Sequence, residues 1–148
     1  MFIIINLIPH ITNRKPINMA GPKGSKYYDI FLKHNVQLIT KDKEIAINEE
    51  GFRLLKEVSK ENSIVAASKN MGISYRKAWG LLRETEYVLG FQLIMKHRGG
   101  KEGGKTYLTP EGTDLVSAYN VLVSDIERSA HDPVKRFFHC INEISDRK

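Results

Sequence analysis

Two short amphipathic helical patterns joined by a tight glycine turn lie between residues 62 and 90, and they constrain the fold more than any other feature. Apolar residues of the first pattern recur at intervals of three and four, as on one helix face: Ile64, Ala67 and Met71. Gly72 can adopt the left-handed conformation that ends a helix, and Ser74 can cap the next helix. That helix directs Ala78, Leu81, Leu82 and Thr85 inward and is expected to end at Gly90. The pattern predicts a helix-turn-helix.

A strand, a basic glycine-rich loop and a second strand are expected next. Residues 91–96 and 106–108 favour β-structure, and residues 97–105 between them hold four glycines. A β-ribbon in this position is the wing of a winged helix-turn-helix. Before the two helices of the helix-turn-helix, the runs 36–40 and 44–47 predict a β-hairpin. Asn48 can cap a further helix after this hairpin.

A long helix is predicted to begin with Thr109 as its cap and Pro110 at its first position. Its apolar residues are spaced four, three and four apart, which suits a two-stranded seam: Leu115, Tyr119, Leu122 and Ile126. We expect the helix to end before Pro133. A short amphipathic segment would follow, with Val134, Phe137, Phe138, Ile141 and Ile144.

The expected fold is therefore mainly α with small β: a winged helix-turn-helix with an N-terminal β-hairpin, a two-stranded wing and a long C-terminal dimerisation helix. Residues 1–34 are interpreted as a flexible extension, 35–130 as the DNA-binding domain and 131–148 as the C-terminal segment. Met19 is a candidate start, because the polar stretch 20–25 follows it.

Basic residues concentrate in the two elements that such a fold presents to DNA. Between Ser74 and Lys105 there are seven basic and three acidic residues, which is most of the chain's net charge of +6. Double-stranded DNA is the expected partner. The expected DNA-contacting residues are Ser74, Tyr75, Arg76, Lys77, Gly80 and Arg83 on the third helix, and Lys96, Arg98, Lys101 and Lys105 on the wing.

Three segments together resemble the N-terminal DNA-binding domain of the ModE-type molybdate-responsive regulators, and more broadly that of LysR-type regulators. They are Gly72–Trp79, Gly99–Lys105 and Leu108–Gly112. The resemblance covers residues 36–128 and implies a homodimer joined through the long helix, with the third helices in successive major grooves. Since about 20 residues follow the long helix, we expect no molybdate-binding module and no small-molecule effector.

Other functions have weaker support. Gly99, Gly104, Lys105 and Thr106 match the P-loop pattern, but a β-prone run follows where a P-loop needs a helix. The histidines and Cys140 form no metal-ligand pattern, and the sequence contains no recognisable Ser/His/Asp set or carboxylate pair for catalysis. No cofactor is expected. Trp79 is interpreted as a half-buried anchor. The alternatives are a protein-interaction module using Phe137, Phe138 and Ile141, and RNA binding through Tyr75 and Tyr107.

The apolar run at residues 1–8 is too short to span a bilayer, and no basic stretch precedes it as in a signal peptide. A single cysteine closes no intramolecular disulfide. We therefore expect a cytoplasmic protein without membrane association.

Overall fold

The computed structural model describes residues 3–5, 23–97, 99 and 104–145. The chain divides into two compact units, one of residues 1–5 and 36–121 and the other of residues 6–35 and 122–148, and each is described by itself. Residues 1–2 and 6–22 of the extension predicted at residues 1–34 lie outside the described residues.

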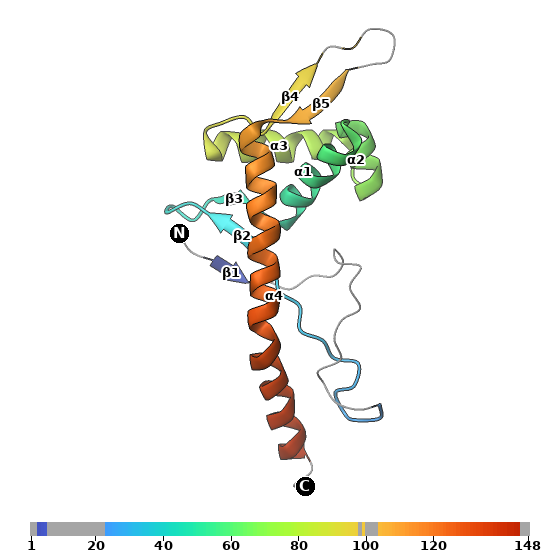
Figure 1. The fold of residues 1–148 in the computed structure, drawn as a ribbon, viewed down its shortest axis with the longest axis vertical. Helices are drawn as coiled ribbons and strands as arrows, with labels where there is room; N and C mark the ends of the chain where they lie inside the picture. Colours follow the sequence, from blue (N-terminus) through green and yellow to red (C-terminus); the bar gives the residue numbers. More distant parts are fainter. Residues whose placement is uncertain (1–2, 6–22, 98, 100–103, 146–148) are drawn as a thin grey trace. The chain divides into compact units, whose positions relative to one another are not determined.

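The first unit begins with a three-stranded antiparallel sheet in the order β1–β2–β3 (Figure 1). Its strands are β1 (Ile3–Ile5), β2 (Val36–Ile39) and β3 (Ile45–Ile47). The predicted hairpin β2–β3 is confirmed, and Lys43 turns it in the left-handed region at φ 67°. Strand β1 was not predicted, because three isoleucines in a row carry no alternation that separates a strand from any other buried segment.

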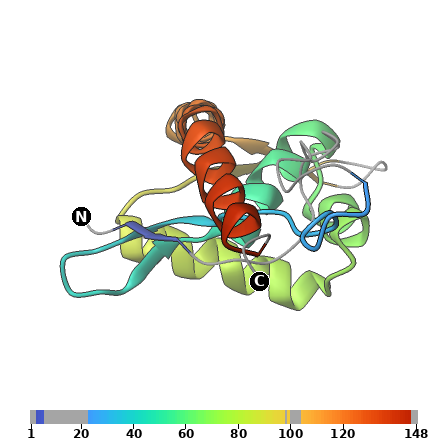
Figure 2. The ribbon, with the colours of Figure 1, turned by 90° about the horizontal axis from the view of Figure 1, so that it is seen from below.

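Three helices follow, each started by a side-chain cap: α1 (Glu49–Glu61), α2 (Ile64–Met71) and α3 (Tyr75–Leu89). The Ser74 hydroxyl accepts a hydrogen bond from the Lys77 amide at 3.1 Å, as predicted. Gly72 and Gly90 end α2 and α3 at φ 68° and 81°. The helix-turn-helix is thereby confirmed, and α3 packs against α1 and α2 and beside β3 (Figure 2).

The wing consists of β4 (Ile94–His97) and β5 (Lys105–Leu108), which pair antiparallel with Lys96 opposite Thr106. Figure 1 shows this ribbon extending beyond the three helices. The predicted wing and the predicted fold class are both confirmed. Strand β4 begins three residues later than expected, and the Leu93 amide just before it binds the Glu86 carboxylate instead of a neighbouring strand.

The core of this unit lies between the helices, the wing and the start of α4 (Pro110–Ser145). Leu54, Leu55 and Val58 of α1 are fully buried there. The Tyr119 ring of α4 stacks on Phe52 with centroids 3.4 Å apart, and its hydroxyl donates to the Val36 carbonyl at 3.4 Å. Tyr119 therefore joins α4 to both α1 and β2.

The junction between the wing and α4 requires its glycine. The Thr109 hydroxyl caps α4 by accepting from the Gly112 amide at 3.0 Å, and it donates to the Gln92 carbonyl. A Cβ at Gly112 would lie 2.3 Å from the Leu93 carbonyl oxygen. The Leu-Thr-Pro-Glu-Gly segment is thus a close contact between a helix start and the wing, and only glycine fits its last position.

The predicted end of the long helix before Pro133 is wrong, since α4 continues through Pro133 to Ser145. A proline inside a helix removes one hydrogen bond and crowds the preceding turn. In the second unit, Ala130, Val134, Phe138 and Ile141 lie three or four residues apart and form one cluster with Tyr27. Burial of a face that is continuous across Pro133 offsets the lost hydrogen bond.

Candidate nucleic-acid interface

Helix α3 presents a polar outer face opposite its buried residues. Ala78, Leu82 and Thr85 are buried, as the spacing predicts, and Leu81 is half-buried. The outward residues predicted to contact DNA are mostly exposed: Ser74, Tyr75, Arg76, Lys77 and Arg83, with Gly80 half-buried. The helix therefore has one face for the core and one that is free to meet another molecule.

The structure describes two of the four wing residues that were predicted to contact DNA. Lys96 and Lys105 are exposed on β4 and β5, whereas Arg98 and Lys101 lie outside the described residues. Strand β5 is also tied to the helices by a backbone bond, since the Thr106 amide donates to the Asn62 carbonyl at 2.9 Å. The base of the wing is thus held against the turn between α1 and α2.

Glu86 of α3 fixes the start of the wing. One carboxylate oxygen accepts hydrogen bonds from the Leu93 and Ile94 amides, at 2.8 Å and 3.2 Å. Sequence reasoning counted Glu86 only as an acidic charge and missed this role. A possible signal was its position one turn before Gly90, where a carboxylate can reach the amides of a strand that reverses direction.

Lys96 is already in contact with α3. Its ammonium group lies 3.7 Å from the centroid of the Trp79 ring, in a cation–π geometry. Trp79 is half-buried and packs against the core, as predicted. Through this pair, the outer surface of β4 is held beside α3.

Lys77 also has an internal partner. Its ammonium group lies 2.6 Å from a Glu50 carboxylate oxygen of α1. Both side chains are exposed, so the pair is screened by water. Lys77 therefore offers a weaker positive field than Arg76 and Arg83 do.

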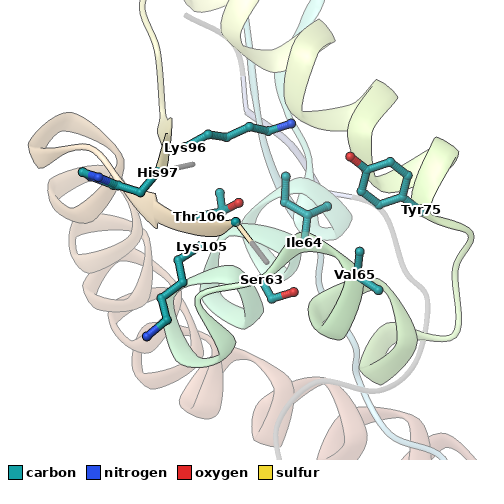
Figure 3. Close-up of a pocket in the computed structure, with 9 residues that line it drawn as sticks. Ser63, Ile64, Val65, Tyr75, Lys96, His97, Lys105 and Thr106 are labelled. Carbon is teal, nitrogen blue, oxygen red and sulfur yellow. The ribbon is translucent and has the colours of Figure 1, made fainter. Parts of the chain in front are cut away.

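A crevice of about 230 Å³ opens where α2, α3 and the wing meet (Figure 3). It is lined by Ser63, Ile64 and Val65 at the start of α2, by Tyr75 at the start of α3, and by wing residues Lys96, His97, Gly104, Lys105 and Thr106. The start of a helix carries free amides and a partial positive charge. Two lysine side chains, the His97 ring and this helix end make the crevice suited to an anionic group.

Sequence reasoning missed several members of this crevice. Ser63 caps α2 by accepting a hydrogen bond from the Ala66 amide at 3.2 Å, and Asn62 before it ends α1. His97 was placed in the loop, but it ends β4 and its ring meets Tyr107 edge-on, with centroids 5.5 Å apart. No local pattern brings residues 63, 75 and 106 together, because only the packing of three elements does so.

The predicted dimerisation residues fall into two groups. Leu115 and Tyr119 pack against the core of the first unit. Leu122 and Ile126 belong to the second unit and are half-buried. Among the large apolar residues of α4 whose burial the structure describes, Val121 and Phe137 are the more exposed, at 61% and 59%.

The protein-interaction alternative loses part of its proposed surface. Phe138 is only 4% exposed and Ile141 packs against it within the second unit, so of the three residues only Phe137 projects outward. The expected partner contact at Phe138 is corrected accordingly, because this ring lies in the interior of a small core, against which the half-buried Ile141 packs.

The P-loop pattern is excluded by backbone geometry, since Lys105 begins strand β5 and no helix starts there. In the part of the chain that the structure describes, no three His, Cys, Asp or Glu side chains gather as a metal site would require. No described helix has the length and apolar character needed to cross a membrane.

Comparison with known proteins gives one consistent group of relatives. No protein-family model matches the chain. It is 35% identical over 85 residues to the transcriptional regulator ModE of Haemophilus influenzae, covering 57% of this chain and 33% of that protein. It is 31% identical over 100 residues to the molybdenum transport protein ModE of Azotobacter vinelandii, covering 68% and 36%. The chain thus spans about a third of the length of the curated relatives it matches.

Among solved structures, a crystal structure of a BenM_DBD/benA site 1 DNA complex covers 60% of this chain and 92% of that chain, with a TM-score of 0.45 and 24% identity. The sequence matches are the stronger result, and they agree with the motifs in the helix-turn-helix and wing. Over more than half of its length, the chain is similar in sequence to the ModE transcriptional regulators.

Proposed function

We propose that this chain binds double-stranded DNA sequence-specifically as a cytoplasmic homodimer and regulates transcription without catalysing a reaction. The carrying observation is the basic crevice in which the start of α2, the start of α3 and the wing converge. An anionic, elongated partner would meet all three elements at once. A DNA backbone has this chemistry.

The two parts of the surface would read DNA differently. Arg76 and Arg83 project from α3, and arginine can bind a guanine edge with two hydrogen bonds in the major groove. Lys105 and the crevice would hold phosphates, which set the register of the protein without reading sequence. Arg98 and Lys101 would extend the phosphate contacts of the wing.

Dimerisation would use α4, with Leu122 and Ile126 as its centre. Exposed Val121 adds apolar surface that the described residues of its own unit leave open. Leu115 and Tyr119, predicted for the same seam, would contribute through the faces that their core contacts leave uncovered. A two-fold dimer can place two α3 helices about 34 Å apart, one turn of DNA.

The test begins with selection of bound duplexes from a random DNA pool. Binding of the selected duplex should weaken steeply with salt, with a slope of about −0.9 per phosphate contact. Arg76→Ala should cost about 1–3 kcal/mol on the selected site and little on random DNA. Lys105→Ala should weaken both equally, and Lys60→Ala, an exposed α1 residue paired with Glu57, serves as the control. A flat salt response would falsify DNA binding.

The dimer is tested separately by sedimentation. The wild-type chain should sediment as a dimer at micromolar concentration, and Leu122→Glu should give a folded monomer with much weaker binding to the selected duplex. Asn120→Asp, at an exposed α4 position, controls for the added charge. A wild-type monomer under these conditions contradicts the dimer and leaves the DNA-binding proposal to the salt series.

A further inference from the structure

Gly80 occupies an unfavourable position for a glycine. It is the sixth of fifteen residues in α3, well away from either cap. Glycine inside a helix destabilises it relative to alanine, because the unfolded chain has more freedom to lose. Its backbone is not in the left-handed region that would call for glycine. The helix itself therefore gains nothing from this residue.

Nothing inside the described chain requires the missing side chain either. A Cβ built on Gly80 meets no atom within 4 Å. The other two helical glycines differ, since a Cβ would lie 3.0 Å from the Ile47 side chain at Gly51 and 2.3 Å from the Leu93 carbonyl oxygen at Gly112. Gly51 and Gly112 serve internal packing, whereas the space at Gly80 is open to another molecule.

The open space lies between two arginines. Arg76 precedes Gly80 by four residues and Arg83 follows it by three, so the three share one face of α3. Seven residues of helix span about 10 Å, which corresponds to roughly three base-pair steps at 3.4 Å each. Each of the two arginines can cover one of these steps. About one base-pair step is then left for the bare backbone between them.

We propose that the α3 backbone at Gly80 contacts the floor of the major groove directly and selects a thymine there through its C5-methyl group. This inference rests on the proposed function. Gly80 is half-buried and carries no side chain, so the group that it can offer to a base edge is its Cα with two hydrogens, which is apolar and accepts no hydrogen bond. The thymine methyl is the apolar group among the major-groove edges, so it loses nothing by facing that surface. The absence of a side chain allows the approach.

The experiment replaces each thymine of the selected duplex, one at a time, with deoxyuridine, which removes the methyl group alone. For the wild-type chain, one such replacement should weaken binding about four-fold, the effect of one buried methyl group. Gly80→Ala should weaken binding to the intact site about ten-fold or more, because its methyl occupies the same space. Its binding should no longer depend on that thymine.

Stability and a matched control separate this effect from damage to the fold. Gly80→Ala should unfold at higher urea concentration than the wild type, since alanine favours the helix. Ser59→Ala, at an exposed α1 position, should leave binding unchanged. The inference is overturned if Gly80→Ala binds the selected duplex as tightly as the wild type does, or if the substitution weakens binding to random DNA by the same factor. It is also overturned if every thymine replacement that weakens binding of the wild type weakens binding of Gly80→Ala equally. A wild-type chain that selects no duplex contradicts the proposed function itself.

Discussion

The ammonium group of Lys96 on β4 lies 3.7 Å from the centre of the Trp79 ring on α3. With the Glu86 carboxylate, which binds two amides at the start of the same strand, this contact joins the wing to α3. The two elements proposed to touch DNA are thereby held in one relative orientation before any partner binds. Such preorganisation lowers the entropy cost of association.

Lys96 and Trp79 should be energetically coupled. We expect Lys96→Met and Trp79→Leu to destabilise the fold singly, and the double variant to show a coupling of about 0.5–2 kcal/mol. Urea unfolding of the four chains measures it. Lys105→Met, on the facing strand, should show no coupling to Trp79→Leu. Strictly additive effects of the Lys96 and Trp79 changes would contradict the cation–π contact.

Glu86→Ala should loosen the wing more than Glu86→Gln does. Alanine leaves the Leu93 and Ile94 amides without their acceptor, at a cost of about 1–3 kcal/mol, whereas glutamine keeps one carbonyl oxygen. Urea unfolding and amide hydrogen exchange at residues 93 and 94 provide the measurements. Glu84→Ala, an exposed acidic neighbour on α3, is the matched control. Equal exchange rates in Glu86→Ala and the wild type would rule out this anchoring role.

The Glu50–Lys77 pair should compete with phosphate binding. Glu50→Gln frees the Lys77 ammonium, so nonspecific DNA binding should tighten and the salt slope should steepen by up to about 0.9. For the same reason Lys77→Ala should flatten the slope less than Lys105→Ala does. The salt dependence of binding to a random duplex gives all three values. If the Lys77 and Lys105 variants lose equal slope, the ion pair does not limit Lys77.

Gly112→Ala should be strongly destabilising. Its new methyl group would lie 2.3 Å from the Leu93 carbonyl oxygen, which is backbone and cannot turn aside. Overpacking of this kind costs about 1–3 kcal/mol or more, and the urea midpoint should fall. Gly80→Ala supplies the contrast, since the same substitution there should raise the midpoint. A Gly112→Ala chain as stable as the wild type would show that the contact between the wing and α4 is loose.

Stability should fall at alkaline pH through Tyr119. Burial, with a smaller effect of Glu49, raises the Tyr119 pKa from its ordinary value of 10.0 to about 12. Because the folded state favours the neutral phenol, its contribution is complete below pH 10 and is lost as the pH rises toward 12. Tyr119→Phe keeps the stacking on Phe52 but has no proton to lose, so its stability should decline less over that range. Parallel stability profiles for the two chains would contradict the shift.

Much of the fold could be predicted because its signals are local. Ser74 indicates a helix start through its hydroxyl, and Gly72 and Gly90 indicate helix ends because they have no side chain. Each lies where it was expected. The end of α4 could not be predicted in the same way. Pro133 is a local signal to stop, and it is overruled by apolar burial at Val134 and Phe138, which depends on what packs against them.

The candidate site divides in the same manner. The outward residues of α3 follow from helical periodicity once Ala78, Leu82 and Thr85 are recognised as buried. The partners of Lys77 and Lys96, by contrast, lie 27 and 17 residues away along the chain, on other elements. A list of basic residues therefore overstates the number of charges that are free to meet DNA.

Apart from strand β1 and the length of α4, the sequence by itself determined the kinds of element, their order, their caps and the concentration of positive charge, because each depends on residues within one or two turns of each other. Only the tertiary structure decided which charges are engaged internally, that Glu86 anchors the wing, and that Gly112 is crowded while Gly80 is open. These properties depend on distances between separate elements. Since a sequence encodes such distances only through the packing of the whole core, the folded chain is needed to distinguish one glycine or lysine from another.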